Sequence, residues 1–151
     1  MAPIEQNYLK LKKIEKGNPS PAFSLQNKEG VNITLDELKG QLIYIDVWAT
    51  WCKPCMAEMP YLKTLEKHFE KEEITFVSIC INDQKKNWLS VITEKEGIQL
   101  FASDPNDPFI DSYAITGIPR FILLDREGVI IDAYAKRPSD KNLIPEIESF
   151  L

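Results

Sequence analysis

The sequence predicts an α/β domain in which a central mixed β-sheet has helices on both faces. The chain has 151 residues, which is about the length of one domain. Short runs rich in Ile, Val, Leu and aromatic residues alternate with segments whose apolar residues recur at helical spacing. The last two apolar runs are separated only by residues 126–128, a turn typical of an antiparallel hairpin, and this makes the sheet mixed.

Small elements are expected before the main sheet. Residues 1–16 are polar and rich in lysine, and they predict an arm that contains one helical turn. The turn-forming residues 27–30 separate two short stretches and predict a β-hairpin. The expected elements are strands at 22–25 and 31–35 and a short helical turn at 36–39, closed by Gly40.

A strand, a helix and a second strand form the predicted centre of the sheet. Residues 42–48 are rich in Ile, Val, Tyr and Trp and indicate a buried strand, and residues 74–81 indicate a second one. The helix is expected to begin near Pro54, because one apolar face follows with a spacing of three to four residues, made of Met56, Met59, Leu62, Leu65 and Phe69. Pro60 is expected to interrupt and kink this helix.

The rest of the chain predicts helices and one further hairpin. The expected elements are a helix at 87–96 stopped by Gly97, a short helix at 107–113, an antiparallel hairpin of 121–125 with 129–134, and a last helix that is capped by Ser139 or Asp140 and ends at Leu151. Pro145 lies inside that last helix and leaves its start open.

Composition and charge exclude several classes of protein. The chain has 18 basic and 23 acidic residues, a formal net charge of −5, which argues against binding to nucleic acid or an anionic membrane. No apolar run approaches the roughly 20 residues of a transmembrane helix. Residues 1–16 carry no signal-peptide pattern, so the chain is either cytoplasmic or the mature part of an exported precursor.

Cys52 and Cys55 are the predicted redox-active residues, because they lie where a predicted strand ends and a predicted helix begins. A thiolate at a helix N-terminus is stabilised by unpaired N–H groups and by the helix dipole. The positive charge of Lys53 adds to this stabilisation. Cys52, at the turn, is expected to be the exposed nucleophile, and Cys55, one turn inside the helix, the shielded resolving thiol. Pro54 fits the first helical turn and stiffens the loop.

Two other interpretations of the cysteines were weighed. Half of a zinc site has the same spacing, but there is no second pair of this kind and the one histidine is His68. We therefore expect no metal and no cofactor. Cys80 lies on a predicted interior strand and is expected to be a buried thiol, with a third redox partner as the alternative.

The motifs of the chain resemble the thioredoxin superfamily, in its TlpA/ResA-like branch related to AhpC/TSA. The resemblance rests on YIDVWATWCKPC at 44–55 with EMP at 58–60, NPSPAFSL at 18–25, LDELKG at 35–40 and GIPRFILLD at 117–125. It covers the chain from Gly17 onward and implies a thioredoxin-like domain at 17–151 with an N-terminal β-hairpin extension, preceded by the arm at 1–16.

The resemblance implies substrate-binding residues around the motif. Pro119 matches the cis-proline that packs beside the two cysteines, and an ordinary trans proline is the alternative. The backbone of Ile118 would pair with a bound substrate chain. Trp51 matches the aromatic residue that flanks the active site, with a packing residue as the alternative. Arg120 stands where the family more often has Thr; it would add positive potential near Cys52 or contact substrate, or else lean into solvent.

Two carboxylates are candidates for proton transfer. Asp46 lies on a strand that is expected to be buried, and burial without a partner would raise its pKa. The resemblance implies that Asp46 helps to move the proton of the resolving thiol; an Asp at a strand edge is the alternative. Glu58 lies about one helical turn after Cys55 and can face the same site. The resemblance implies that Glu58 tunes thiol ionisation, and a solvated surface Glu is the alternative.

The predicted function is thiol–disulfide exchange with substrate proteins, with the chain acting as a reductant. Its expected partners are proteins bearing disulfides or dithiols and a redox partner that recycles the two cysteines. The resemblance implies a periplasmic or cell-envelope location, and a monomer is expected. A non-catalytic binding module remains an alternative. A thiol peroxidase is disfavoured because Ala49 stands three residues before Cys52, where that class needs Thr or Ser. A copper chaperone is disfavoured because no His lies near the cis-proline segment.

Overall fold

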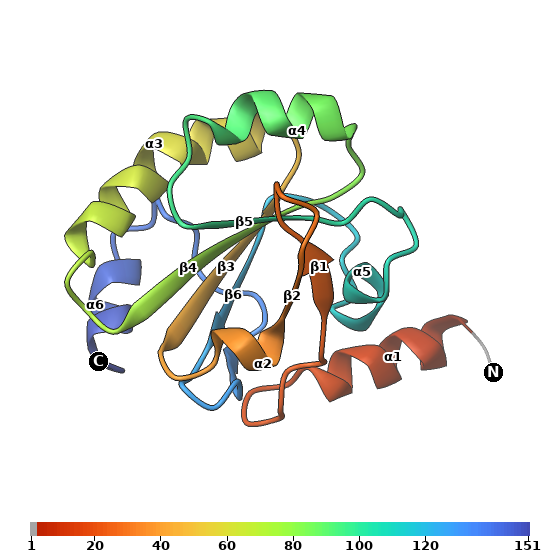
Figure 1. Ribbon diagram of the computed structural model, residues 1–151. Coiled ribbons are helices and arrows are strands. Elements are labelled where there is room, and N and C mark those ends of the chain that lie inside the picture. The colour runs from red at the N-terminus through yellow and green to blue at the C-terminus, as the bar shows by residue number, and fades with distance from the viewer. Residues whose placement is uncertain (1–2) are drawn as a thin grey trace.

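A seven-stranded mixed sheet forms the centre of the molecule, and helices cover both of its faces (Figure 1). The computed structural model describes residues 3–151. The strand order is β2-β1-β5-β4-β3-β6-β7. The elements are α1 (Pro3–Lys13), β1 (Ser24–Gln26), β2 (Asn32–Thr34), α2 (Leu35–Leu38), β3 (Leu42–Trp48), α3 (Lys53–His68), β4 (Ile74–Cys80), α4 (Lys85–Ile92), β5 (Ile98–Phe101), α5 (Pro108–Ser112), β6 (Arg120–Leu124), β7 (Ile130–Asp132) and α6 (Leu143–Glu148).

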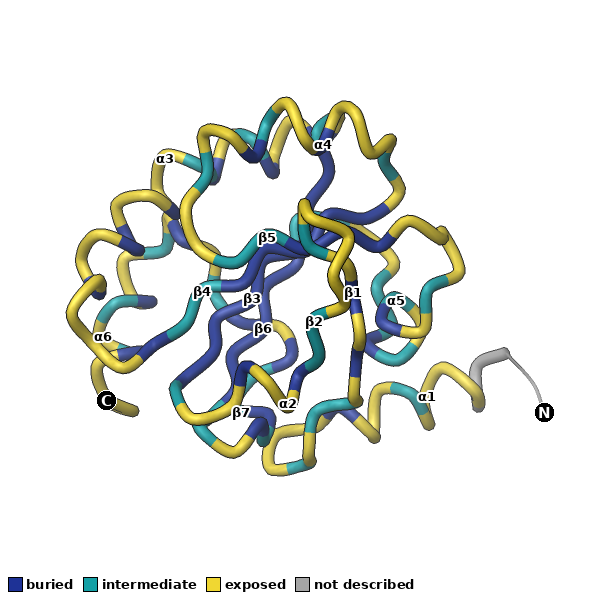
Figure 2. Tube along the Cα trace, in the orientation of Figure 1, coloured by how far each residue is buried: buried dark blue, intermediate teal, exposed yellow. Residues whose placement is uncertain are grey.

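Strand β3 lies at the centre of the fold and is buried along all seven of its residues (Figure 2). Because successive side chains of a strand point to opposite faces, Ile43, Ile45 and Val47 join the core that contains Phe109 of α5. The side chain of Tyr44 joins a second core beneath α3 and α6. β4 pairs with β3 in parallel, and β5 pairs with β4 in parallel, whereas β6 is antiparallel to β3. The predicted mixed sheet is therefore confirmed.

Several predicted elements differ from the observed ones. α1 is a helix of eleven residues rather than a single turn. β5 was not predicted as a strand; its four residues are too few to show a period, and pairing with β4 is what orders them. α4 ends at Ile92 rather than at residue 96. The division into an arm at 1–16 and a domain from residue 17 stays a prediction.

The two prolines inside predicted helices behave differently from expectation. α3 continues through Pro60 to His68, so the predicted interruption is wrong. α6 begins only at Leu143, and Pro145 therefore lies in its first turn, where a missing N–H leaves no helical hydrogen bond unmade. Neither Ser139 nor Asp140 caps this helix, because its N-cap is Asn142.

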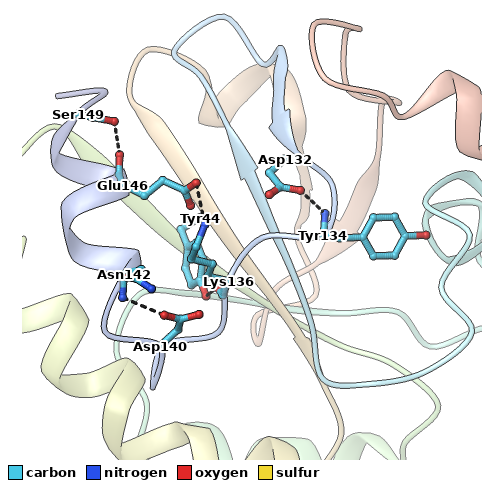
Figure 3. Close-up of polar contacts among 8 residues, drawn as sticks. All are labelled: Tyr44, Asp132, Tyr134, Lys136, Asp140, Asn142, Glu146 and Ser149. Atoms are coloured by element: carbon cyan, nitrogen blue, oxygen red, sulfur yellow. Dashed lines mark hydrogen bonds and ion pairs between the residues drawn. The ribbon is translucent and has the colours of Figure 1, made fainter.

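The segment between β7 and α6 is fixed to the sheet by side chains (Figure 3). The Tyr44 hydroxyl donates a hydrogen bond to the Lys136 carbonyl oxygen over 2.7 Å. Lys136 Nζ in turn lies 3.2 Å from Glu146 Oε2 on α6. These contacts hold the following residues, Pro138 and Ser139, against the N-terminal half of α3. Among residues 3–151 there is no helix long and apolar enough to cross a bilayer.

Candidate active site

The redox motif lies where β3 ends and α3 begins, as the sequence predicts. Cys52 is the N-cap of α3 and is disulfide-bonded to Cys55, with the two Cα atoms 5.3 Å apart. The Cys55 N–H points at Cys52 Sγ over 3.3 Å, so an otherwise unpaired helix N–H faces the sulfur. Pro54 lies in the first turn, and Lys53 is exposed beside it.

The expected difference in exposure between the two cysteines is wrong for this disulfide form. Cys52 and Cys55 are each only 4% exposed. Both belong to an apolar cluster that includes Trp48, and Met56 and Ile118 pack against that cluster. Packing by these side chains, which sequence spacing does not reveal, covers the sulfur of Cys52.

A groove beside the motif contains two of the three predicted substrate-binding residues, Trp51 and Ile118. Trp51 is 61% exposed, and its Nε1–H donates to the Asn82 carbonyl oxygen over 2.8 Å. The Ile118–Pro119 peptide bond is cis, so the trans alternative is wrong. The groove has a volume of about 320 Å³ and is lined by Trp51, Ile81, Asn82, Ile115, Thr116, Gly117 and Ile118.

A small cavity adjoins Cys55. Its volume is about 10 Å³, close to the space that one water molecule needs. The residues around it include four predicted site residues, namely Asp46, Cys55, Glu58 and Pro119, together with Lys95. The structure therefore brings the resolving cysteine, both candidate carboxylates and the cis-proline to one place.

Asp46 is buried and partnered rather than placed at a strand edge. It is 6% exposed and accepts a hydrogen bond from the Ser78 hydroxyl on β4. Lys95 Nζ lies 3.8 Å from Asp46 Oδ2, and the side chain of this lysine is only 4% exposed. Burial raises the pKa of Asp46, while the Lys95 charge and the Ser78 hydrogen bond work in the opposite direction.

Lys95 is a site residue that sequence reasoning missed. It comes from the connection between α4 and β5, and its ammonium also lies 4.7 Å from the centre of the Trp48 ring. Nearby Glu66 is 9% exposed, and burial together with the charge of Asp46 raises the pKa of this glutamate to about 7. Lys95 stands between two Glu residues near the end of the helix predicted at 87–96, a pattern typical of a solvated helix surface, so nothing in the sequence indicated that its side chain is buried.

Glu58 is also held in place rather than solvated. It is 8% exposed, and Ser139 donates to it twice, from its backbone N–H over 2.9 Å and from its hydroxyl over 2.7 Å. Arg137 Nη1 lies 3.9 Å away. Ser139 was considered only as a helix cap, because its distance from Glu58 in the sequence hides their contact.

Arg120 is buried, so the alternative of a solvent-facing side chain is wrong. It is 7% exposed and donates to the carbonyl oxygens of Ala133 over 2.8 Å and Tyr113 over 3.0 Å. Its guanidinium lies 3.6 Å from the centre of the Tyr134 ring. It is absent from the lining of the cavity at Cys55. Burial lowers the pKa of Arg120.

Comparison with known proteins places these features in a family. The family model described as Redoxin matches residues 15–150. The thiol–disulfide oxidoreductase ResA of Bacillus subtilis is 28% identical over 121 residues, which cover 78% of this chain and 66% of the relative. Among solved structures, a protein of Bacteroides vulgatus described as a thiol–disulfide oxidoreductase is 37% identical, with a TM-score of 0.83 over 92% of this chain and 99% of that one.

A second structure from Bacteroides vulgatus, the thioredoxin domain of a thiol–disulfide oxidoreductase, is 27% identical. It has a TM-score of 0.79 and covers 90% of this chain and 97% of that one. The matched region includes the sheet, the two cysteines at the start of α3 and the cis-proline segment. The chain belongs to the Redoxin family and is a thiol–disulfide oxidoreductase of the thioredoxin fold, similar to the TlpA/ResA-like proteins.

Proposed function

We propose that this protein reduces disulfide bonds in other proteins through Cys52, with Cys55 as the resolving thiol. The observation that carries this proposal is the placement of the Cys52–Cys55 disulfide at a helix N-terminus, directly against the cavity that contains the two buried carboxylates. Helix N–H groups favour the Cys52 thiolate, while a nearby carboxylate offers a destination for the proton of Cys55.

The reaction proceeds in two exchange steps. The Cys52 thiolate attacks one sulfur of the substrate disulfide; a new S–S bond joins Cys52 to the substrate, and the other substrate sulfur leaves as a thiolate. Cys55 then loses its proton to Asp46 and attacks the Cys52 sulfur. The mixed disulfide breaks, the Cys52–Cys55 disulfide forms, and the substrate departs with two more electrons. The raised pKa of Asp46 brings it closer to that of a thiol, which eases the proton transfer.

The groove beside Trp51 is the proposed substrate site. An extended substrate segment would pair with the backbone of Ile118 and contact the exposed face of Trp51, with Pro119 closing the site near the cysteines. Lys53 and Pro54 tune the thiolate from within the motif. Arg120 tunes the site indirectly, because its two hydrogen bonds to the Ala133 and Tyr113 carbonyl oxygens fix the start of β6, directly after the cis-proline.

The chemistry and the relatives support the proposed partners and location. A protein that loses two electrons per cycle needs a redox partner that returns them, so we include such a partner in the proposal. The similarity to ResA and to a DsbE-type thiol:disulfide interchange protein of Chlorobium tepidum supports work outside the cytoplasm, in the cell envelope. We propose that the protein acts as a monomer.

Reduction of insulin by dithiothreitol, followed by turbidity, tests the direction of the reaction. The protein should accelerate insulin precipitation, Cys52→Ser should abolish the acceleration, and Cys80→Ser should keep it. Absence of acceleration by the unaltered protein would contradict the proposed function and favour a binding module. Rapid consumption of hydrogen peroxide by a protein that does not accelerate insulin precipitation would favour the peroxidase alternative.

A further inference from the structure

The loop that follows β4 holds the redox loop in place. Three hydrogen bonds join residues 81–83 to residues 48–51: Ile81 N–H to the Trp48 carbonyl oxygen at 2.9 Å, Thr50 N–H to Asp83 Oδ2 at 2.6 Å, and Trp51 Nε1–H to the Asn82 carbonyl oxygen at 2.8 Å. In two of these bonds the acceptor is a backbone carbonyl oxygen, and only in the third is it a side chain, that of Asp83. Asp83 is therefore the residue of this loop whose replacement alters the anchor.

The carboxylate of Asp83 also contacts the third cysteine. Cys80 Sγ lies 3.6 Å from Asp83 Oδ2, the same oxygen that accepts from Thr50. The other oxygen, Oδ1, accepts from Gln84 N–H over 2.8 Å. Burial alone would raise the pKa of Asp83, but the hydrogen bonds from Thr50 and Gln84 outweigh it and lower that pKa. Asp83 is thus an ionised acceptor at neutral pH.

Cys80 is a third thiol in the apolar cluster that contains the redox pair, Cys52 and Cys55. It is fully buried. Thiol–disulfide exchange requires a thiolate, so the protonation state of Cys80 decides whether it takes part. Burial and the negative charge of Asp83 both raise the pKa of Cys80. The proton stays on its sulfur, where it is donated to the carboxylate.

We propose that Asp83 is a positioning residue of the redox centre, which uses one carboxylate oxygen both to anchor the redox loop at Thr50 and to keep Cys80 as an unreactive thiol. Exchange is thereby confined to Cys52 and Cys55. The anchoring task rests on the proposed function, because its readout is catalysis. The second task does not, because the reactivity of Cys80 is measured without any substrate protein.

Alkylation of the oxidised protein tests the second task. With the Cys52–Cys55 disulfide intact, Cys80 is the one free cysteine, and its thiolate displaces iodide from iodoacetamide to form a thioether. Asp83→Asn and Asp83→Ala should each speed this reaction severalfold, because loss of the Asp83 charge lowers the Cys80 pKa and raises the fraction of thiolate, while burial still opposes ionisation. The pH profile of the rate should shift to lower pH. The control Asp36→Asn removes a charge from an exposed ion pair on α2 and should change nothing.

The insulin assay tests the anchoring task, because the two variants differ in what they retain. Asparagine still offers an oxygen to Thr50 N–H, so Asp83→Asn should keep activity within about twofold, whereas Asp83→Ala should lose about tenfold. Urea unfolding of each variant separates these effects from lost stability. Alkylation rates that follow only the unfolding equilibrium, or full activity in Asp83→Ala, would overturn the proposal. An inactive unaltered protein would contradict the proposed function alone, and the alkylation rates would still decide the role of Asp83 at Cys80.

Discussion

Replacing Cys55 with serine should trap substrate proteins on Cys52 as stable mixed disulfides. The resolving attack depends on a second thiol held one helical turn from the first, with a Cα–Cα distance of 5.3 Å in the disulfide form. Serine cannot make that attack, and external thiols replace it slowly because they lack its high effective concentration, so turnover should fall at least about a hundredfold. Non-reducing electrophoresis of a cell extract, followed by mass spectrometry, detects the adducts.

Matched variants identify the sulfurs that take part in the trapped complex. Cys52→Ser should form no adduct, because the attacking thiol is gone. Cys55→Ser combined with Cys80→Ser should form as many adducts as Cys55→Ser alone, since Cys80 is fully buried. Adducts that map to Cys80, or an extract in which Cys55→Ser forms none, would contradict the proposed roles of the two cysteines.

Replacing Lys95 with methionine should destabilise the fold by about 3–5 kcal/mol at pH 7, the usual cost of removing one partner from a buried ion pair. The side chains of Lys95 and Asp46 are only 4% and 8% exposed, so water cannot compensate the carboxylate that remains. Urea unfolding measures the loss. Below the pKa of Asp46 the carboxyl is neutral in both proteins, so the difference should shrink as the pH falls from 7 towards 4.

A double variant isolates the interaction from the effect of a changed side-chain shape. Asp46→Asn removes the charge that Lys95 compensates, so Asp46→Asn with Lys95→Met should recover most of the lost stability. A loss that is the same at pH 4 and pH 7, with no recovery in the double variant, would mean that the Asp46–Lys95 ion pair is not its cause.

The main features of the site could be predicted because they depend on local sequence. Cys52 and Cys55 follow a strand of seven residues that are all apolar or aromatic except Asp46, and the next residues have helical spacing. Burial of Asp46 follows from the same strand pattern, and its raised pKa follows from burial. The cis bond before Pro119 came from the resemblance, since composition and spacing do not distinguish it from a trans bond.

The partners of those residues could not be predicted, because they depend on how distant loops return to the site. Lys95 lies near the end of one predicted helix and Ser139 at the predicted start of another, both in polar segments, yet each places a polar group on a carboxylate of the cavity. The burial of Cys52 also depends on a distant segment, since Ile118, from the connection between α5 and β6, packs against the cluster that contains Cys52. The sequence does not decide whether Arg120 faces the site or solvent, whereas its hydrogen bonds to Ala133 and Tyr113 hold the side chain inside the protein.

The reduction potential of the Cys52–Cys55 pair tests the central claim most directly. The protein would be equilibrated in dithiothreitol or glutathione buffers, and the reduced fraction measured by alkylation and mass spectrometry. A reductant of protein disulfides should have a potential near about −270 mV or below, towards the thioredoxin end of the range. A value above about −200 mV would contradict the reductant assignment and point to an oxidase or isomerase. The absence of any reversible two-thiol couple would contradict thiol–disulfide exchange altogether.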